Sequence, residues 1–203
     1  MASGRPRTFA EDDVLQAATR TFWQQGYDGT SLQDLLEATG LSKSSLYQSF
    51  GNKQQLFHAC VQRYAEHSVS NLRQQLQASA TVQAFLREWL GTALRECGGD
   101  DSGQPARVPR GCMLVNVATE FSQRDPQLAA IIDNGMVAIR AVIAEALRQG
   151  QGNDPRRNLW AENTAMTLHT LMVGLRTQVK AGVSAAALSA VIDQVISSLP
   201  LAE

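Results

Sequence analysis

Apolar side chains recur at intervals of three and four residues along almost the whole of this 203-residue chain. That spacing gathers them on one face of an α-helix, whereas a half-buried β-strand needs apolar and polar residues to alternate. No segment of the sequence shows sustained alternation. The pattern therefore predicts an all-α protein, and glycine and proline residues divide it into about nine helices.

The overall composition excludes several classes of protein. Hydrophobic residues make up 44% of the chain and charged residues 18%, which is typical of a globular protein. The formal net charge of −1 argues against a protein that coats nucleic acid through bulk positive charge. No apolar run approaches the roughly 18 residues of a membrane span, and the N-terminal MASGRPRTF has no signal-peptide core. We therefore expect a cytoplasmic protein with no membrane partner.

Capping residues predict the limits of the first helices. The first helix is expected to begin after Thr8, which forms a capping box with Glu11, and to end at Gly26. Ser31 and Asp34 predict a second capping box at the start of a short helix that reaches about residue 38. The sequence therefore places a compact group of short helices at its N-terminal end.

A glycine turn follows that short helix. Gly40 makes the turn, and Ser42 is expected to cap a third helix that stops near Gly51. The fourth helix is predicted to begin at Asn52 and to run toward Gln77. Further helices are predicted over residues 81–97, 112–122, 126–148, 156–181 and 184–199, with a loop over residues 98–111.

Two short helices joined by a glycine turn match a helix-turn-helix, although such pairs also occur in ordinary helical bundles. Ser44, Ser45 and Gln48 are short enough to enter a major groove about 12 Å wide and to bond base edges. Residues 38–65 hold three basic residues and no acid, whereas residues 1–37 hold three arginines and six acids; the basic residues are Lys43, Lys53 and Arg63. The positive potential is therefore expected around the third helix, where Lys43 and Lys53 can reach phosphates.

The stretch from Arg7 to about Tyr64 resembles the DNA-binding domain of TetR-family transcriptional regulators. The resemblance rests on the motifs GY at 26–27, GTS at 29–31, TGLS at 39–42 and LYxxFxxK at 46–53. It implies that residues 42–48 form the helix that reads DNA, that Tyr47 and Lys53 contact phosphates, and that Thr30 or Ser31 does so as well. The expected DNA-binding residues are Thr30, Ser31, Ser42, Lys43, Ser44, Ser45, Tyr47, Gln48 and Lys53.

The same resemblance implies two domains. The first is a DNA-binding domain at residues 1–51, with its helix-turn-helix motif over about residues 30–49. This domain extends to about residue 65 through the start of the fourth helix. The second domain, residues 52–203, binds an effector and dimerises. Beyond residue 80 the sequence shows no nucleophile–base motif and no phosphate-binding glycine loop, so no enzyme is expected. Candidates for an effector pocket, which also suit a place in the core, are Phe85, Trp89, Cys112, Met113, Phe121, Met136, Trp160, Met166, His169 and Met172.

The three cysteines are an odd number at wide spacing, which fits thiols in a reducing compartment. They do not combine with the three histidines in a ligand spacing, so neither a metal nor a cofactor is expected. The segment RGCMLVN at 110–116 resembles the opening of helix six in one subset of these regulators. That resemblance implies a redox or electrophile sensor at Cys112; the alternative is a cysteine that only fills space. Cys97 precedes the loop over residues 98–111 and is the candidate for a resolving thiol.

The last two helices carry apolar stripes that suit dimerisation or burial within one subunit. The expected interface residues are Ala165, Leu168, Leu175, Leu188, Val191, Ile192, Val195, Ile196 and Leu199. A homodimer places two reading helices about 34 to 36 Å apart, on a roughly palindromic double-stranded operator. We therefore expect a DNA-binding regulator, a repressor released by a small-molecule or reactive effector; the alternatives are an activator or non-inducible DNA binder, or a helical carrier or enzyme.

Overall fold

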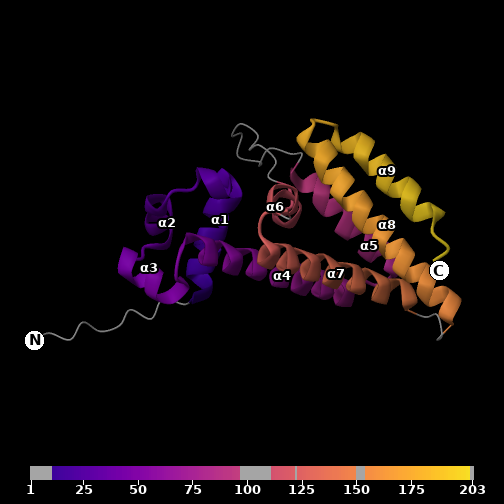
Figure 1. The fold of residues 1–203 in the computed structure, drawn as a ribbon. Coiled ribbons are helices and arrows are strands. Elements are labelled where there is room, and N and C mark those ends of the chain that lie inside the picture. The colour runs from indigo at the N-terminus through magenta and orange to yellow at the C-terminus, as the bar shows by residue number, and fades with distance from the viewer. Residues whose placement is uncertain (1–10, 97–110, 122, 150–153, 202–203) are drawn as a thin grey trace, which may run out of the picture. The chain divides into compact units, whose positions relative to one another are not determined.

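The computed structural model describes residues 11–96, 111–121, 123–149 and 154–201. These ranges contain nine α-helices and one 3-10 helix, and they contain no β-strand (Figure 1). The all-α fold predicted from the apolar spacing is therefore confirmed. The chain divides into two compact units, residues 1–64 and residues 65–203, and helix α4 (Lys53–Ala78) contributes to both.

The first unit contains α1 (Glu11–Gly29), α2 (Leu32–Thr39), α3 (Lys43–Phe50) and the beginning of α4. Gly26 was expected to end the first helix, and its φ of 74° and ψ of 171° do interrupt the helical backbone. One more turn follows the interruption, so α1 continues to Gly29 beyond a kink. The predicted capping residue Thr8 lies outside the described residues.

Local hydrogen bonds fix the pair of short helices as the sequence predicted. The Ser31 hydroxyl accepts a hydrogen bond from the Asp34 backbone at 3.1 Å, and the Asp34 carboxylate accepts one from the Ser31 backbone at 2.7 Å. Gly40 adopts the left-handed conformation, with φ 67° and ψ 12°, after the end of α2. The Ser42 hydroxyl then accepts from the Ser45 backbone at 3.1 Å at the start of α3. The turn between α2 and α3 therefore has the geometry of a helix-turn-helix.

The core of the first unit joins all four of its helices. Phe22 of α1 packs edge-on against Phe57 of α4, with ring centroids 4.9 Å apart. Leu35 of α2 and Leu46 of α3 are fully buried. Burying a side chain of this size stabilises the fold by about 1.5 to 3 kcal/mol relative to leaving it in water. The core therefore fixes the angle between α2 and α3 and leaves the polar side of α3 in solvent.

The second unit consists of the rest of α4 and six further elements. These are α5 (Val82–Gly91), the 3-10 helix η1 (Thr92–Glu96), α6 (Met113–Phe121), α7 (Pro126–Arg148), α8 (Pro155–Lys180) and α9 (Ala185–Ser198). The sequence predicted one helix over residues 81–97, but the α-helix ends at Gly91 and continues as a 3-10 turn. Within that turn the Thr92 hydroxyl donates to the Trp89 carbonyl at 2.7 Å, which supports the tighter winding.

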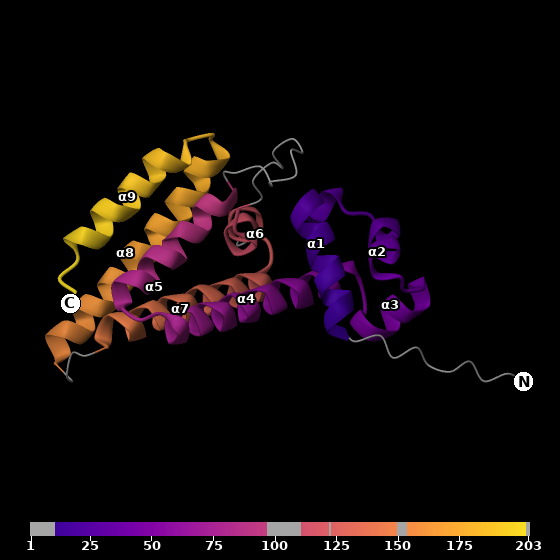
Figure 2. The ribbon, with the colours of Figure 1, turned by 180° about the vertical axis from the view of Figure 1, so that it is seen from behind.

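The helices of the second unit pack as neighbours within one core. α7 lies against α8 and α6, while α9 lies along α5 and η1 (Figures 1 and 2). Asp125 and Asp154 cap α7 and α8, and a proline follows each of them. The predicted helix over residues 126–148 is confirmed.

Helix α7 departs from the expectation of no apolar run long enough to cross a membrane. Among the described helices it alone meets that criterion, by length and composition only. A core helix of a soluble protein passes the same test, and the buried face of α7 includes Leu128, Ile132, Val142 and Leu147. We attribute the apolar character of α7 to its packing against α6 and α8.

Candidate functional site

Helix α3 separates a buried face from an exposed face. Leu46 and Phe50 point into the core of the first unit, with 0% and 8% of their surface exposed. Lys43, Ser44 and Gln48 are exposed, Ser45 is half-buried, and Tyr47 is 40% exposed, which is unusual for a large aromatic residue. The exposed residues that the sequence assigned to DNA contact therefore lie on the face of α3 that solvent can reach. We call Lys43, Ser44, Tyr47 and Gln48 the reading face.

The serine hydroxyls at the start of α3 bond one another. The Ser42 oxygen lies 3.0 Å from the Ser44 oxygen and 2.8 Å from the Ser45 oxygen, in addition to capping the helix. Ser42 and Ser45 therefore already have hydrogen-bond partners within the helix. Such a network holds the three side chains in fixed positions at the end of the reading face.

Thr30 and Ser31, the two alternatives for a phosphate contact at the start of α2, lie in different environments. Thr30 is 1% exposed, and its hydroxyl donates to the Gly26 carbonyl at 2.6 Å. Ser31 is exposed beside it. The hydroxyl of Thr30 therefore stabilises the kink after Gly26 from inside the unit, and only Ser31 lies at the surface.

Lys53, at the first turn of α4, lies against an aromatic ring. Its ammonium nitrogen is 4.3 Å from the ring centroid of Tyr27, a cation–π geometry. The hydrogen bonds with Ser31 lower the pKa of Asp34, and the positive charge of Lys53 lowers it to a smaller extent. The direct contact of the Lys53 ammonium is therefore the Tyr27 ring.

Arg63 does not add to the positive surface in the way its sequence position suggested. Its guanidinium is half-buried and bonds both carboxylate oxygens of Asp12 in α1, with Nη2 2.8 Å from Oδ2. This hydrogen bonding raises the pKa of Arg63 above its ordinary value. The basic stretch therefore offers Lys43 and Lys53 to a polyanion, while the charge of Arg63 is compensated within the unit.

The predicted effector residues are distributed between the core and the half-buried layer of the second unit. Phe85, Trp89, Met113 and Met172 are buried. The half-buried ones are Cys112, Phe121, Met136, Trp160 and His169. The four buried side chains therefore act as core residues, which is the alternative that the sequence left open.

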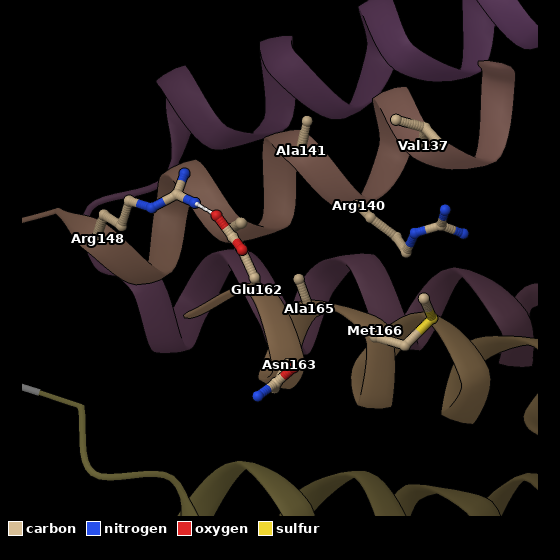
Figure 3. A pocket seen from close by; sticks show the side chains of 9 residues that line it. Val137, Arg140, Ala141, Arg148, Glu162, Asn163, Ala165 and Met166 are labelled. Carbon is tan, nitrogen blue, oxygen red and sulfur yellow. Dashed lines mark hydrogen bonds and ion pairs between the residues drawn. The ribbon is translucent and has the colours of Figure 1, made fainter. Parts of the chain in front are cut away.

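Of the predicted effector residues, the exposed Met166 lines a pocket between α7 and α8, and the nine others do not. That pocket encloses about 400 Å³, and its lining residues are Val137, Arg140, Ala141, Ala144, Arg148, Glu162, Asn163, Ala165 and Met166. Figure 3 shows the Arg148–Glu162 ion pair, at 2.9 Å, toward one end and Arg140 with Met166 toward the other. Val137 and Met166 are about half exposed, at 48% and 49%. The pocket is therefore an open groove with a largely apolar lining, in which Arg140 and the Arg148–Glu162 ion pair are the charged groups.

His169 of α8 lies beside the charged side of this helix pair. Burial and, to a smaller extent, the positive charges of Arg140 and Arg176 lower the pKa of His169 to about 4. The histidine is therefore neutral in the folded chain at pH 7 and titrates well below the ordinary histidine pKa of about 6.5.

This shift predicts a pH-dependent stability. Between pH 6.5 and pH 4 the unfolded chain binds a proton at residue 169 while the folded chain does not, so folding weakens as the pH falls through that window. Allowing for partial solvent screening, we expect the wild type to lose about 2 kcal/mol more than His169→Gln over this range. Urea unfolding of both proteins at pH 7 and pH 4.5 measures the difference. Equal losses in both proteins contradict a depressed pKa at His169.

The two described cysteines differ in their surroundings. Cys60 of α4 is fully buried, and burial raises its pKa to about 12. Cys112 is half-buried and directly precedes α6. The proposed resolving residue Cys97 lies outside the described residues.

The glycine before Cys112 has a steric role. Gly111 has a φ of 68°, and a Cβ atom there would lie 2.7 Å from Cε of Lys180 at the end of α8. The Lys180 ammonium donates to the Asn116 side chain of α6 at 3.0 Å. The glycine of the RGC segment therefore gives Lys180 room to reach the start of α6.

Most of the predicted dimer residues are buried inside the single chain. Ala165, Leu168 and Leu175 of α8 and Leu188, Ile192 and Ile196 of α9 are at most 5% exposed. Val191 is 42% exposed, and Val195 and Leu199 are half-buried. The stripes of α8 and α9 are covered by α7, α5 and η1 of the same chain, so six of the nine side chains cannot present themselves to a partner.

Within the described ranges, no three His, Cys, Asp or Glu side chains gather in an arrangement that holds a metal ion.

Comparison with known proteins agrees with the helix-turn-helix geometry. The family of bacterial regulatory proteins named tetR matches residues 14–60, and a tetracyclin repressor-like C-terminal domain matches residues 101–195. The HTH-type transcriptional repressor ComR of Escherichia coli is 32% identical over 155 residues, which cover 75% of this chain and 71% of ComR. The HTH-type transcriptional repressor AcnR of Corynebacterium efficiens is 25% identical over 98% of this chain and 97% of its own length.

A solved structure gives the same result for the whole fold. A cysteine mutant of the TetR-family regulator CifR, complexed with 26-base-pair double-strand operator DNA, superposes with a TM-score of 0.75 and 26% identity. The match covers 97% of this chain and 100% of CifR. These relatives are transcriptional regulators and not enzymes. The exposed reading face, the two family domains and the similarity to ComR together show that this chain belongs to the TetR family of transcriptional regulators.

Proposed function

We propose that this regulator is a cytoplasmic, homodimeric repressor that binds a palindromic double-stranded operator through the reading face of α3. The observation that carries the proposal is that face itself, where short polar side chains and an exposed tyrosine stand over a buried apolar face. Two named relatives, ComR and AcnR, are transcriptional repressors, and CifR is complexed with operator DNA. The DNA-binding domain comprises residues 1–51 and extends to about residue 65, and residues 52–203 sense the effector and dimerise.

Each polar residue of this region has a distinct proposed role. Ser44 and Gln48 are exposed and bond base edges, while Lys43 bonds a phosphate or a guanine. Tyr47, Lys53 and Ser31 contact backbone phosphates and so set the orientation of α3 in the groove. Ser42 and Ser45 fix the start of the helix, and Thr30 acts from inside the unit.

The proposed dimer interface uses apolar surface that remains exposed on the C-terminal helices. Val191 of α9 is exposed, with Val195 and Leu199 half-buried along the same helix, and Leu159 of α8 is 59% exposed. The six buried residues of these stripes support the interface from within the core. Each subunit offers few uncompensated cations, so tight binding requires both reading helices at once.

Release from DNA requires an effector that binds better to the state with weak operator affinity. The groove between α7 and α8 supports a small-molecule effector, because apolar side chains line it beside Arg140 and Arg148. A second candidate is alkylation or oxidation of Cys112, which lies at the start of α6 where Lys180 and Asn116 meet. Helix α4 contributes residues to both units and is the proposed route between the effector and α3.

The phosphate and base assignments predict different behaviour of two variants. Lys53→Met is expected to weaken binding by about tenfold for all DNA sequences and to reduce the slope of log affinity against log salt by about one per subunit. Gln48→Ala is expected to leave that slope almost unchanged and to alter base preference at one position of each half-site. Fluorescence anisotropy with a duplex selected from a randomised pool measures both properties.

Lys180→Met is the matched control, since Lys180 lies in the other unit and bonds Asn116. Its affinity and salt slope should equal those of the wild type. If Lys53→Met also keeps the wild-type affinity and slope, Lys53 does not contact a phosphate. If the protein retains no duplex at all at low salt, the reading-face proposal fails as a whole.

A further inference from the structure

The ammonium of Lys53 has an unusual position for a surface lysine. Lys53 is half-buried, and its nitrogen lies 4.3 Å from the centroid of the Tyr27 ring. Within the part of the chain that the structure describes, no hydrogen bond or ion pair engages this nitrogen. The aromatic ring is therefore its direct partner in this unit.

An aromatic ring and a carboxylate hold a cation in different ways. The face of the ring attracts the charge of the ammonium as a whole and requires no particular N–H bond. An ammonium has three N–H donors, so Lys53 keeps donors available for an external acceptor. Arg63 of the same helix is the contrast, because Asp12 accepts from both its Nε and its Nη2. Lys53 is therefore held in place while its donors remain available to an anion.

The Tyr27 ring is itself fixed from behind. It lies 4.9 Å from the ring of Phe57 and 6.1 Å from the ring of Phe22, measured between centroids. The kink at Gly26 directly precedes Tyr27, and the backbone carbonyl of Tyr27 accepts a hydrogen bond from the Thr30 backbone N–H at 3.3 Å. The backbone and the aromatic core thus fix this ring, whereas lysine alone has a flexible four-carbon stem.

We infer that Tyr27 is a positioning residue for DNA binding, whose ring holds the Lys53 ammonium where a backbone phosphate of the operator accepts its hydrogen bonds. The inference rests on the proposed function, which assigns Lys53 to a phosphate. Tyr27 acts through Lys53 and does not itself contact DNA in this assignment. Its role can therefore be separated from that of Lys53 by combining substitutions at both positions.

The test is a double-mutant cycle on the full chain, with a duplex of about 30 base pairs selected from a randomised pool by the wild type. Tyr27→Leu removes the ring face and is expected to weaken binding about two- to fivefold per subunit and to lower the salt slope. Tyr27→Phe keeps the ring face and should therefore have the operator affinity and the salt slope of the wild type. In a Lys53→Met background, Tyr27→Leu should have no further effect.

A structural loss must be distinguished from a positioning loss. Tyr64→Leu is the matched control, because it removes a ring from the Trp23–Tyr64 pair, whose centroids are 5.5 Å apart in the same unit. It should lower the unfolding temperature and leave the salt slope unchanged. NMR gives a measurement without DNA: the ring current should move the Lys53 ε-methylene protons upfield of those of Lys180 in the wild type and in Tyr27→Phe, even if Tyr27→Leu does not fold.

The outcomes separate the two assignments. If Lys53→Met leaves affinity and salt slope unchanged, the phosphate contact of the proposed function fails. If Lys53→Met weakens binding but Tyr27→Leu weakens it equally in both backgrounds, the positioning role of Tyr27 alone is overturned. An absent upfield shift of Lys53 in the wild type overturns it as well.

Discussion

Replacing Gly135 by alanine is expected to lower the free energy of unfolding of the second unit by about 2 kcal/mol, although alanine is the better helix former. A Cβ atom at Gly135 of α7 would lie 2.9 Å from Cβ of Ala65 in α4 and 3.4 Å from Cδ1 of Leu114 in α6. The Cβ of Ala65 is attached directly to the backbone, so no side-chain rotation relieves the contact. The helices must separate instead, and Gly135→Val should cost about 3 kcal/mol or more.

Gly174→Ala is a control that is expected to change the free energy of unfolding in the opposite direction. Gly174 lies inside α8, and a Cβ atom there meets no atom within 4 Å. That substitution should raise stability by about 0.5 to 1 kcal/mol, because alanine loses less backbone entropy in a helix. Urea unfolding followed by circular dichroism measures all three variants. The close approach of α7 to α4 is contradicted if Gly135→Ala stabilises the chain as much as Gly174→Ala does.

The features that the sequence predicted well depend on residues three or four positions apart. The Ser31–Asp34 capping box, the turn at Gly40 and the Ser42 cap of α3 are of this kind. The side chain and the backbone group that it bonds are covalently close, so the identity of a few residues decides the geometry. The family resemblance adds the same type of information, since its motifs lie within residues 26–53.

The features that the sequence missed join residues far apart in the chain. Tyr27 and Lys53 are 26 positions apart, and Arg63 bonds Asp12 across 51 positions. No local pattern identifies which helix faces which, so the sequence does not show that Asp12 compensates the charge of Arg63. For the same reason the sequence predicted only Met166 among the residues that line the pocket between α7 and α8, because that lining comes from one face of each of two helices.

The apolar stripes of α8 and α9 show the limit of periodicity. Spacing predicts that Leu168 and Ile192 are buried, and both are. It does not predict whether the covering surface belongs to the same chain or to a partner. Here α7, α5 and η1 cover most of each stripe, and the part left for a partner is the exposed remainder around Val191.

Iodoacetamide is expected to modify Cys112 at least about a hundredfold faster than Cys60, because alkylation requires an accessible thiolate. Cys60 is fully buried, and at pH 8 a thiol with its pKa of about 12 is ionised in only about one molecule in ten thousand. The Cys60 thiol donates to the Leu15 carbonyl at 3.8 Å, and burial outweighs the nearby positive charge of Arg63, which favours the thiolate. Cys112 is half-buried at the start of α6, within reach of solvent. Mass spectrometry of proteolytic peptides at successive times resolves each cysteine.

The functional consequence is tested with the same reagent. If Cys112 senses electrophiles, its alkylation should weaken operator binding in step with the labelling of its peptide, and Cys112→Ser should bind DNA normally and resist the reagent. Cys60 serves as the internal control, since its peptide should remain unmodified while affinity falls. A Cys112→Ser protein that oxidants or alkylating agents still release fully from DNA eliminates Cys112 as the sensor. The groove between α7 and α8 then remains as the proposed effector site, because its lining contains no cysteine.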